Sequence, residues 1–178
     1  MSSFSTVRTA LDRLYWLSGV IASMFLVAIL VLIVIQMFAR WTGEVFSGAP
    51  DYAGYCMAAA SFFAFSYALN RGSHIRVSIL LNSVGTRVRR YLNIWCFGVG
   101  SALAWYFCYY AIKTTYWSWK FNDVSQGQDA TPLWIPQMSM VIGVTIFAIA
   151  LTDHFLHVIF AGDHRITSEI IKQNKEDA

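Results

Sequence analysis

Four apolar runs without a charged residue constrain this chain more than any other feature. They cover residues 14–39, 52–70, 91–112 and 130–152. An α-helix rises about 1.5 Å per residue, so about 20 residues cross a hydrocarbon core of roughly 30 Å, and all four runs are long enough or nearly so. Only 13% of the residues are charged, against about 25% in soluble domains. Too few polar faces remain to cover a soluble bundle of four buried helices.

The runs therefore predict an all-α integral membrane protein, with residues 1–178 forming a single membrane domain. We expect four transmembrane helices, at about residues 14–38, 51–70, 91–112 and 134–158. The first run exceeds the 7–15 or so apolar residues of a secretory signal peptide, so it is predicted to be a retained helix. The three cysteines lie inside apolar runs without a CxxC spacing, and we interpret them as packing side chains.

Basic residues indicate how the spans are oriented, because cytoplasmic flanks of membrane helices are enriched in lysine and arginine. With four spans, the N-terminal segment, the loop between the second and third spans and the C-terminal segment share one side. That side holds ten of the thirteen basic residues: Arg8, Arg13, Arg71, Arg76, Arg87, Arg89, Arg90, Arg165, Lys172 and Lys175. The sequence therefore predicts that both termini are cytoplasmic.

Residues 76–90 are predicted to form an amphipathic helix that lies in the membrane interface. At 100° per residue, its apolar side chains fall within an arc of about 100°, and its arginines lie outside that arc. Such a helix rests on the cytoplasmic leaflet and binds anionic phospholipid headgroups. The predicted anchoring residues are Arg71, Arg76, Arg87, Arg89 and Arg90. A nucleic-acid-binding patch is the weaker alternative, because no basic domain surrounds these arginines, and we predict no nucleic-acid partner.

A substrate pathway or an active site is not visible in the sequence. Ionisable residues inside membrane spans mark ion and substrate paths, and the four apolar runs contain no Asp, Glu, Lys or Arg. No P-loop, HExxH, GxSxG or Rossmann pattern occurs. We therefore predict a protein that is not an enzyme, with no catalytic residue, no metal ligand and no cofactor.

Histidines keep one alternative function open. Asp153, His154 and His157 lie where the fourth span is expected to leave the lipid. His74 and His154 could converge on a haem, which would make the chain the haem-binding membrane-anchor subunit of a respiratory oxidoreductase. A stand-alone channel or carrier is a third class. The alternative without a function is that Asp153 and the histidines are interfacial polar residues, with Asp153 and His157 paired at i, i+4.

The second run carries small residues at four-residue spacing. Ala60, Ala64 and Ala68 make one smooth ridge on a helix. Such ridges let helices approach closely in lipid, where packing replaces the hydrophobic effect. We predict that this ridge packs against a helix, either of this chain or of a larger partner.

Three stretches carry a resemblance to a known family: "GSHIRVSILL" at residues 72–81, "TRVRRYLNIW" at 86–95 and "DATPLWIPQ" at 129–137. Together they resemble the small membrane subunit of tripartite ATP-independent periplasmic (TRAP) transporters, and the layout is similar over nearly the whole chain. Two positions depart from the family pattern. Ser78 stands where an acid often follows "RV", and Pro50 with Asp51 stands where paired acids often open the second span.

The resemblance implies an accessory scaffold subunit of a sodium-coupled, binding-protein-dependent secondary transporter for an organic acid, in the bacterial inner membrane. It implies two partners, a large membrane transport subunit and a soluble periplasmic substrate-binding protein. The substrate itself is not indicated. The binding protein would meet the short outer loops, whose charged residues are mixed in sign and suit a transient partner. The docking candidates are Arg40, Glu44, Lys120, Asp123 and Asp129.

Overall fold

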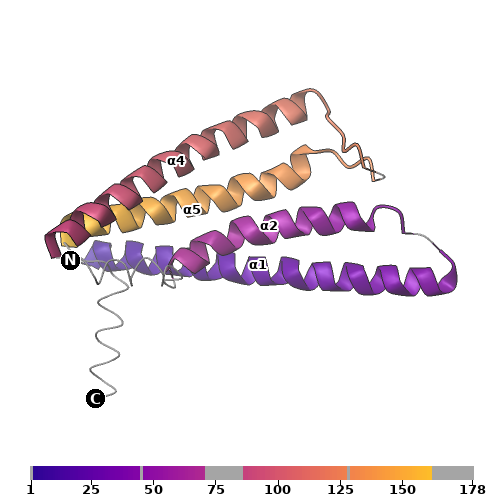
Figure 1. The fold of residues 1–178 in the computed structure, drawn as a ribbon, viewed down its shortest axis with the longest axis horizontal. Coiled ribbons are helices and arrows are strands. Elements are labelled where there is room, and N and C mark those ends of the chain that lie inside the picture. The colour runs from indigo at the N-terminus through magenta and orange to yellow at the C-terminus, as the bar shows by residue number, and fades with distance from the viewer. Residues whose placement is uncertain (1, 45, 71–85, 128, 162–178) are drawn as a thin grey trace, which may run out of the picture.

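The structure, a computed structural model, describes residues 2–44, 46–70, 86–127 and 129–161. Four helices make up most of it, as Figure 1 shows: α1 (Ser2–Thr42), α2 (Ala49–Asn70), α4 (Thr86–Lys120) and α5 (Trp134–Ala161). The described residues contain no β-strand beyond one isolated antiparallel bridge. The prediction of an all-α fold is therefore confirmed.

Each predicted span lies inside one helix, but the helices run further than predicted. Residues 113–120, expected in a loop, continue α4 to Lys120. Residues 86–90 form the first turn of α4, so this part of the predicted interfacial helix belongs to the same helix as the third span. The sequence gives α4 no reason to stop earlier at either end: residues 101–126 contain no glycine or proline, and neither do residues 86–97. Residues 76–85 lie outside the described part of the chain.

Length and hydropathy identify two of the described helices as candidate membrane spans. They are α1, over Arg8–Thr42, and α5, over Trp134–Ile159. Large apolar side chains remain exposed on every described helix. An exposed apolar surface of this extent marks contact with a membrane or with a partner protein.

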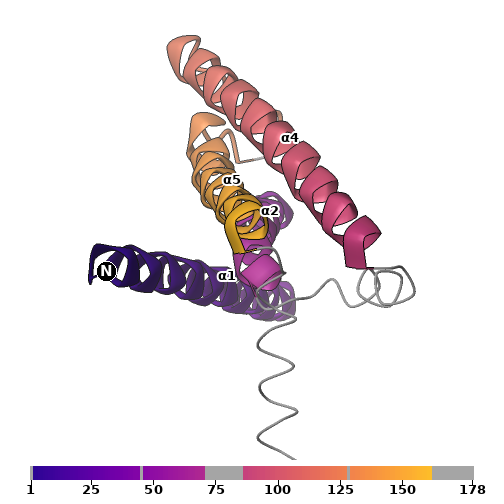
Figure 2. The same ribbon diagram turned by 90° about the vertical axis from the view of Figure 1, so that its left-hand side faces the viewer.

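The helices form two antiparallel hairpins, α1 with α2 and α4 with α5, and α2 packs against α5 to join them (Figure 1). Both hairpin loops, residues 43–48 and 121–133, lie at the same end of the bundle, which we call the loop end. The N-terminus lies at the opposite end. Figure 2 shows that α4 crosses α5 at an angle and moves away from α2 toward the loop end. Its only extensive helix contact among the described helices is with α5.

Small and weakly polar residues bring the helices together. Ser18 of α1 and Ser66 of α2 are fully buried and share a hydrogen bond of 2.7 Å. Gly143 of α5 lies directly against the backbone of Phe62 in α2. Close contact of this kind is what holds helices together in lipid, where apolar side chains gain little by leaving the solvent.

Hydroxyl and indole groups connect α4 to α5. Ser101 and Thr152 share a hydrogen bond of 2.9 Å, and the indole of Trp105 donates to the Thr152 hydroxyl at 3.1 Å. Nearer to the loop end, the Cys108 sulfur of α4 lies 3.2 Å from the Thr145 hydroxyl of α5. These contacts lie along the first two thirds of α4, and further toward the loop end Thr115 and Ser118 of α4 are also buried.

Candidate functional site

An ordered loop between α4 and α5 is the most structured feature of the loop end. Helix α4 ends at Lys120, and in the turn that follows, the positive φ of 51° at Asn122 lets the Asp123 amide donate to the Ser118 carbonyl at 3.0 Å. The chain then folds back on itself. The Ser125 amide donates to the Thr131 carbonyl at 2.8 Å, and the Leu133 amide donates to the Asp123 carbonyl at 2.9 Å.

Side chains join this loop to the start of α2. The Tyr55 hydroxyl donates to the Ser125 hydroxyl at 2.7 Å, and the Thr131 hydroxyl reaches the Tyr52 hydroxyl at 3.4 Å. We call Tyr52, Tyr55, Ser125, Asp129 and Thr131 the loop clasp. It connects the second half of the bundle to the first at the loop end, where α4 itself has moved away.

Asp129 is the charged member of the loop clasp. Both of its carboxylate oxygens are enclosed, and neither closes a hydrogen bond of standard geometry with a described residue. The Thr131 hydroxyl is the largest of the influences that hold the pKa of Asp129 below its ordinary value; Ser125 and Tyr55 act in the same direction, and partial removal from water opposes them. Asp129 is therefore a carboxylate at neutral pH, close to the hydroxyl groups of Thr131, Ser125 and Tyr55.

Two glycines make room for the loop clasp. A Cβ atom on Gly48 would lie 3.2 Å from the Asp129 Cβ atom, and one on Gly127 would collide with the Asp51 carboxylate. The Gly127 amide also donates to the Ser125 hydroxyl at 3.1 Å. Sequence reasoning found Asp129 but not its four partners in the loop clasp, because tyrosine, serine and threonine near a span end are ordinary residues there.

The predicted docking residues divide into two groups. Arg40, Glu44, Lys120 and Asp123 are exposed at the loop end, at the C-terminal ends of α1 and α4 and just beyond them. The Lys120 ammonium also lies 5.0 Å from the ring centre of Trp117. Asp129, in contrast, is turned into the loop clasp, which favours a structural role for its carboxylate over direct contact with a partner.

The predicted packing ridge coincides only in part with the buried face of α2. Ala60 is buried, whereas Ala64 and Ala68 are half-buried. The buried residues of α2 are Ala49, Ala59, Ala60, Phe63, Ser66 and Leu69. The close helix contacts at Ser66 and Gly143 were not predicted. A single serine or glycine in an apolar run is the sequence signal that could have indicated them.

Among the predicted anchoring arginines, only Arg90 has a described side chain. It is exposed, and its guanidinium donates to the Ile159 carbonyl at 3.4 Å, near the C-terminal end of α5. The last carbonyls of a helix lack intrahelical donors, so a cation is favourable there. Arg87 and Arg89 lie in the first turn of α4, and Arg71 and Arg76 fall outside the described residues.

The acid and histidines of α5 lie near the same end of the bundle. His154 is buried, with its ring stacked on Phe97 at 5.8 Å between centroids. Asp153 and His157 are half-buried, and His74 falls outside the described residues. Within the described part of the chain, no group of three or more His, Cys, Asp or Glu residues could hold a metal ion.

Apolar helices with exposed hydrophobic faces are typical of a helical membrane protein. Residues 29–161 match the family of tripartite ATP-independent periplasmic transporters, DctQ component. The chain therefore belongs to this family, the small membrane subunits of TRAP transporters. No curated protein and no solved structure gives a significant match. The family match favours a transporter component over the haem-binding alternative.

Proposed function

We propose that this chain is the fixed accessory subunit of a sodium-coupled transporter for an organic acid, and that it pairs with the large membrane subunit. The family match over residues 29–161 is the observation that carries the proposal. The four apolar runs are also free of Asp, Glu, Lys and Arg up to residue 152, so the ion and substrate sites are assigned to the large subunit. The substrate is selected outside this chain.

A fixed role also fits the way in which the bundle is held together. The loop clasp ties the α4–α5 loop to α2 at one end, and the Arg90–Ile159 hydrogen bond ties α4 to α5 near the other. Serine, threonine and glycine contacts connect the helices between these ends. Packed elements of this kind resist relative sliding, as a scaffold beside a moving partner must.

We place the loop end in the periplasm and both termini in the cytoplasm, with all four helices crossing the inner membrane. The ten-to-three division of basic residues supports this orientation. Aromatic residues suit the membrane interface, and Trp41, Trp117, Trp119 and Trp134 lie near the loop end of α1, α4 and α5. The exposed charges Arg40, Glu44, Lys120 and Asp123 would then face the binding protein.

Transport in liposomes tests the proposed function. The large subunit, this chain and the binding protein are expected to give uptake together with a sodium gradient. Leaving out any one of them is expected to abolish uptake, and this chain alone is expected to carry none. Uptake by this chain alone would make it a carrier in its own right, and a Soret absorption band in the purified chain would restore the haem alternative.

Cysteine labelling in whole cells tests the orientation. In a background lacking the native thiols, Ser47→Cys and Gln126→Cys are expected to react with an impermeant maleimide, and Ser83→Cys is not. Gln126 is exposed, whereas the neighbouring Ser125 takes part in the loop clasp. The reverse labelling pattern would overturn the proposed topology.

Charge substitutions separate docking from the structural role of Asp129. Arg40→Glu combined with Lys120→Glu is expected to slow uptake when the binding protein is limiting, because exposed charges steer encounter. Excess binding protein should partly restore uptake, and assembly with the large subunit should stay normal. Asp129→Asn is expected instead to lower the Tm of the complex, with no recovery at high binding-protein concentration. Docking at these charges is refuted if the double reversal leaves uptake unchanged throughout a titration at low salt, where steering is strongest.

A further inference from the structure

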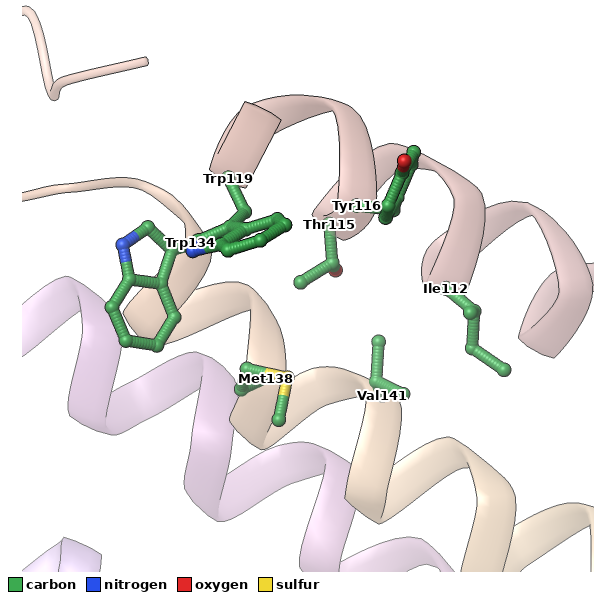
Figure 3. Close-up of a pocket in the computed structure, with 7 residues that line it drawn as sticks. All are labelled: Ile112, Thr115, Tyr116, Trp119, Trp134, Met138 and Val141. Carbon is green, nitrogen blue, oxygen red and sulfur yellow. The ribbon is translucent and has the colours of Figure 1, made fainter. Parts of the chain in front are cut away.

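An open slot lies between α4 and α5 near the loop end. Its volume is about 330 Å³. Ile112, Thr115 and Trp119 line it from α4, and Trp134, Met138 and Val141 line it from α5, as Figure 3 shows. Trp119 and Trp134 lie at the end of the slot next to the α4–α5 loop, with Ile112 and Val141 deeper in the bundle (Figure 3).

The walls of the slot are apolar. Thr115 and Tyr116 are the residues of the lining that carry hydroxyl groups, and the Thr115 hydroxyl already donates to the Ala111 carbonyl within α4 at 2.9 Å. A buried polar ligand would find few partners there, and water needs two to four. Trp119 and Trp134 add large amphipathic rings at the mouth, where an apolar body and a polar tip suit the membrane interface.

The depth of the slot places it at a boundary of the lipid. At the end of α5 away from the slot, the Arg90 guanidinium donates to the Ile159 carbonyl, so a basic residue lies at that end of the helix. The helix is expected to leave the lipid at Asp153, and along α5 Val141 lies about 18 Å from Asp153 and Trp134 about 28 Å, at about 1.5 Å per residue. A hydrocarbon core is about 30 Å thick, and the headgroups extend the bilayer to about 40–45 Å. The deep part of the slot therefore faces acyl chains, and the tryptophans lie at the level of the headgroups.

The size of the slot selects among possible occupants. A helix with its side chains is about 10–12 Å wide and advances about 5.4 Å per turn, so a single turn fills more than about 400 Å³. A partner's helix could therefore only lie across the mouth of a slot of about 330 Å³ and place side chains in it, whereas a stretch of hydrocarbon tail can enter it along its length. An empty slot would forfeit the dispersion contacts of its walls.

We propose that this slot binds one acyl chain of a phospholipid from the leaflet at the loop end. The lipid's glycerol and phosphate lie beside Trp119 and Trp134. Lys120 follows Trp119 at the end of α4 and supplies a cation at the height of the phosphate. The lipid fills the space between the outer part of α4 and α5. This site goes beyond the transport role, and it rests on the proposed membrane topology.

Lipid retention by the full-length chain tests the proposal. The chain is extracted from bacterial membranes in mild detergent and its bound phospholipid is measured by native mass spectrometry. Thr115→Trp, which fills the slot, is expected to lose the retained phospholipid. Thr114→Trp is the matched control at the same depth, because Thr114 is exposed on another face of α4. Equal retention by the two variants would overturn the proposal.

Because Thr115 is buried, a second measurement uses an exposed wall residue. Met138→benzoylphenylalanine, a photoreactive substitution, is introduced in intact membranes, with Ile142→benzoylphenylalanine as the control beside it on α5. The proposal expects a phospholipid adduct at position 138 that survives delipidating washes, and an adduct at position 142 that is lost in them. Crosslinking of position 138 to a polypeptide, or equal loss of both adducts, would refute the proposal.

Discussion

Replacing Gly143 with leucine is expected to separate α5 from α2 and to remove most of the folded chain from the membrane. A Cβ atom at this position would lie 2.7 Å from the Phe62 Cβ atom, and 2.9 Å and 3.1 Å from the Phe62 carbonyl carbon and oxygen. Two of these three atoms belong to the backbone, so no change of rotamer can relieve the collision. Overpacking of a well-packed core costs about 1–3 kcal/mol, and an entire leucine against a backbone lies at or above that range.

The effect is measurable as the yield of detergent-extracted, monodisperse chain and as its Tm. Gly54→Leu is the matched control in the partner helix α2, because a Cβ atom at Gly54 meets nothing within 4 Å. The control is expected to behave like the original protein. Equal yield and equal Tm for the two leucine variants would show that α2 and α5 do not cross at Gly143.

The existence of the helices could be predicted from the sequence, and their ends could not. An apolar run without charges has only one stable backbone conformation in lipid, since every amide must be paired within the segment. This requirement for paired amides does not determine where a helix ends once the chain reaches the membrane interface. Residues 113–120 therefore continue α4, although Lys113 and Lys120 suggested a loop. The turn that ends α4 depends on Asn122 in a left-handed conformation, which asparagine adopts more readily than most residues.

The loop clasp shows why a site is harder to predict than a span. Thr131 and Tyr52 are far apart in the sequence, and they meet only because the two hairpins pack with their loops at the same end. In the sequence, Asp129 is one more acid in a polar loop, equivalent to Asp123. Only the fold distinguishes the two, because it exposes Asp123 and encloses the Asp129 carboxylate.

Packing between the helices was hard to predict for the same reason: it depends on residues that only the fold brings together. The alanine ridge was found because spacing is visible in one helix, and Ala60 is indeed buried. The buried hydrogen bond between α1 and α2 is instead made by Ser18 and Ser66, one from each helix. A pairing between helices depends on their register, which is set by the short connection at residues 43–48 and by Gly43, whose φ of 82° ends α1.

Ser66→Leu is therefore expected to separate α1 from α2, with a loss of folded yield and of Tm as large as that of Gly143→Leu. Ser66 is fully buried, and its hydroxyl lies 2.7 Å from that of Ser18. A leucine adds bulk at a position with no free space on the α1 side. Gly19, next to Ser18, is also in close contact with Tyr67, since a Cβ atom there would lie 2.7 Å from the tyrosine ring. The two helices therefore cannot separate slightly at one contact without loosening the other.

Two companion variants show whether size or hydrogen bonding is responsible. Ser66→Ala removes the hydroxyl but keeps the small volume, and hydrogen bonds between membrane helices contribute only about 0.6 kcal/mol on average. Ser18 also donates to the Tyr15 carbonyl at 2.8 Å, so its hydroxyl keeps a partner. Ser66→Ala is thus expected to lower the Tm only slightly. Ser61→Leu is the control for added bulk, because Ser61 is exposed on the same helix and its hydroxyl donates to the Met57 carbonyl one turn away. If Ser66→Ala is as harmful as Ser66→Leu, the hydrogen bond holds the pair; if Ser61→Leu is as harmful, α2 packs through a different face.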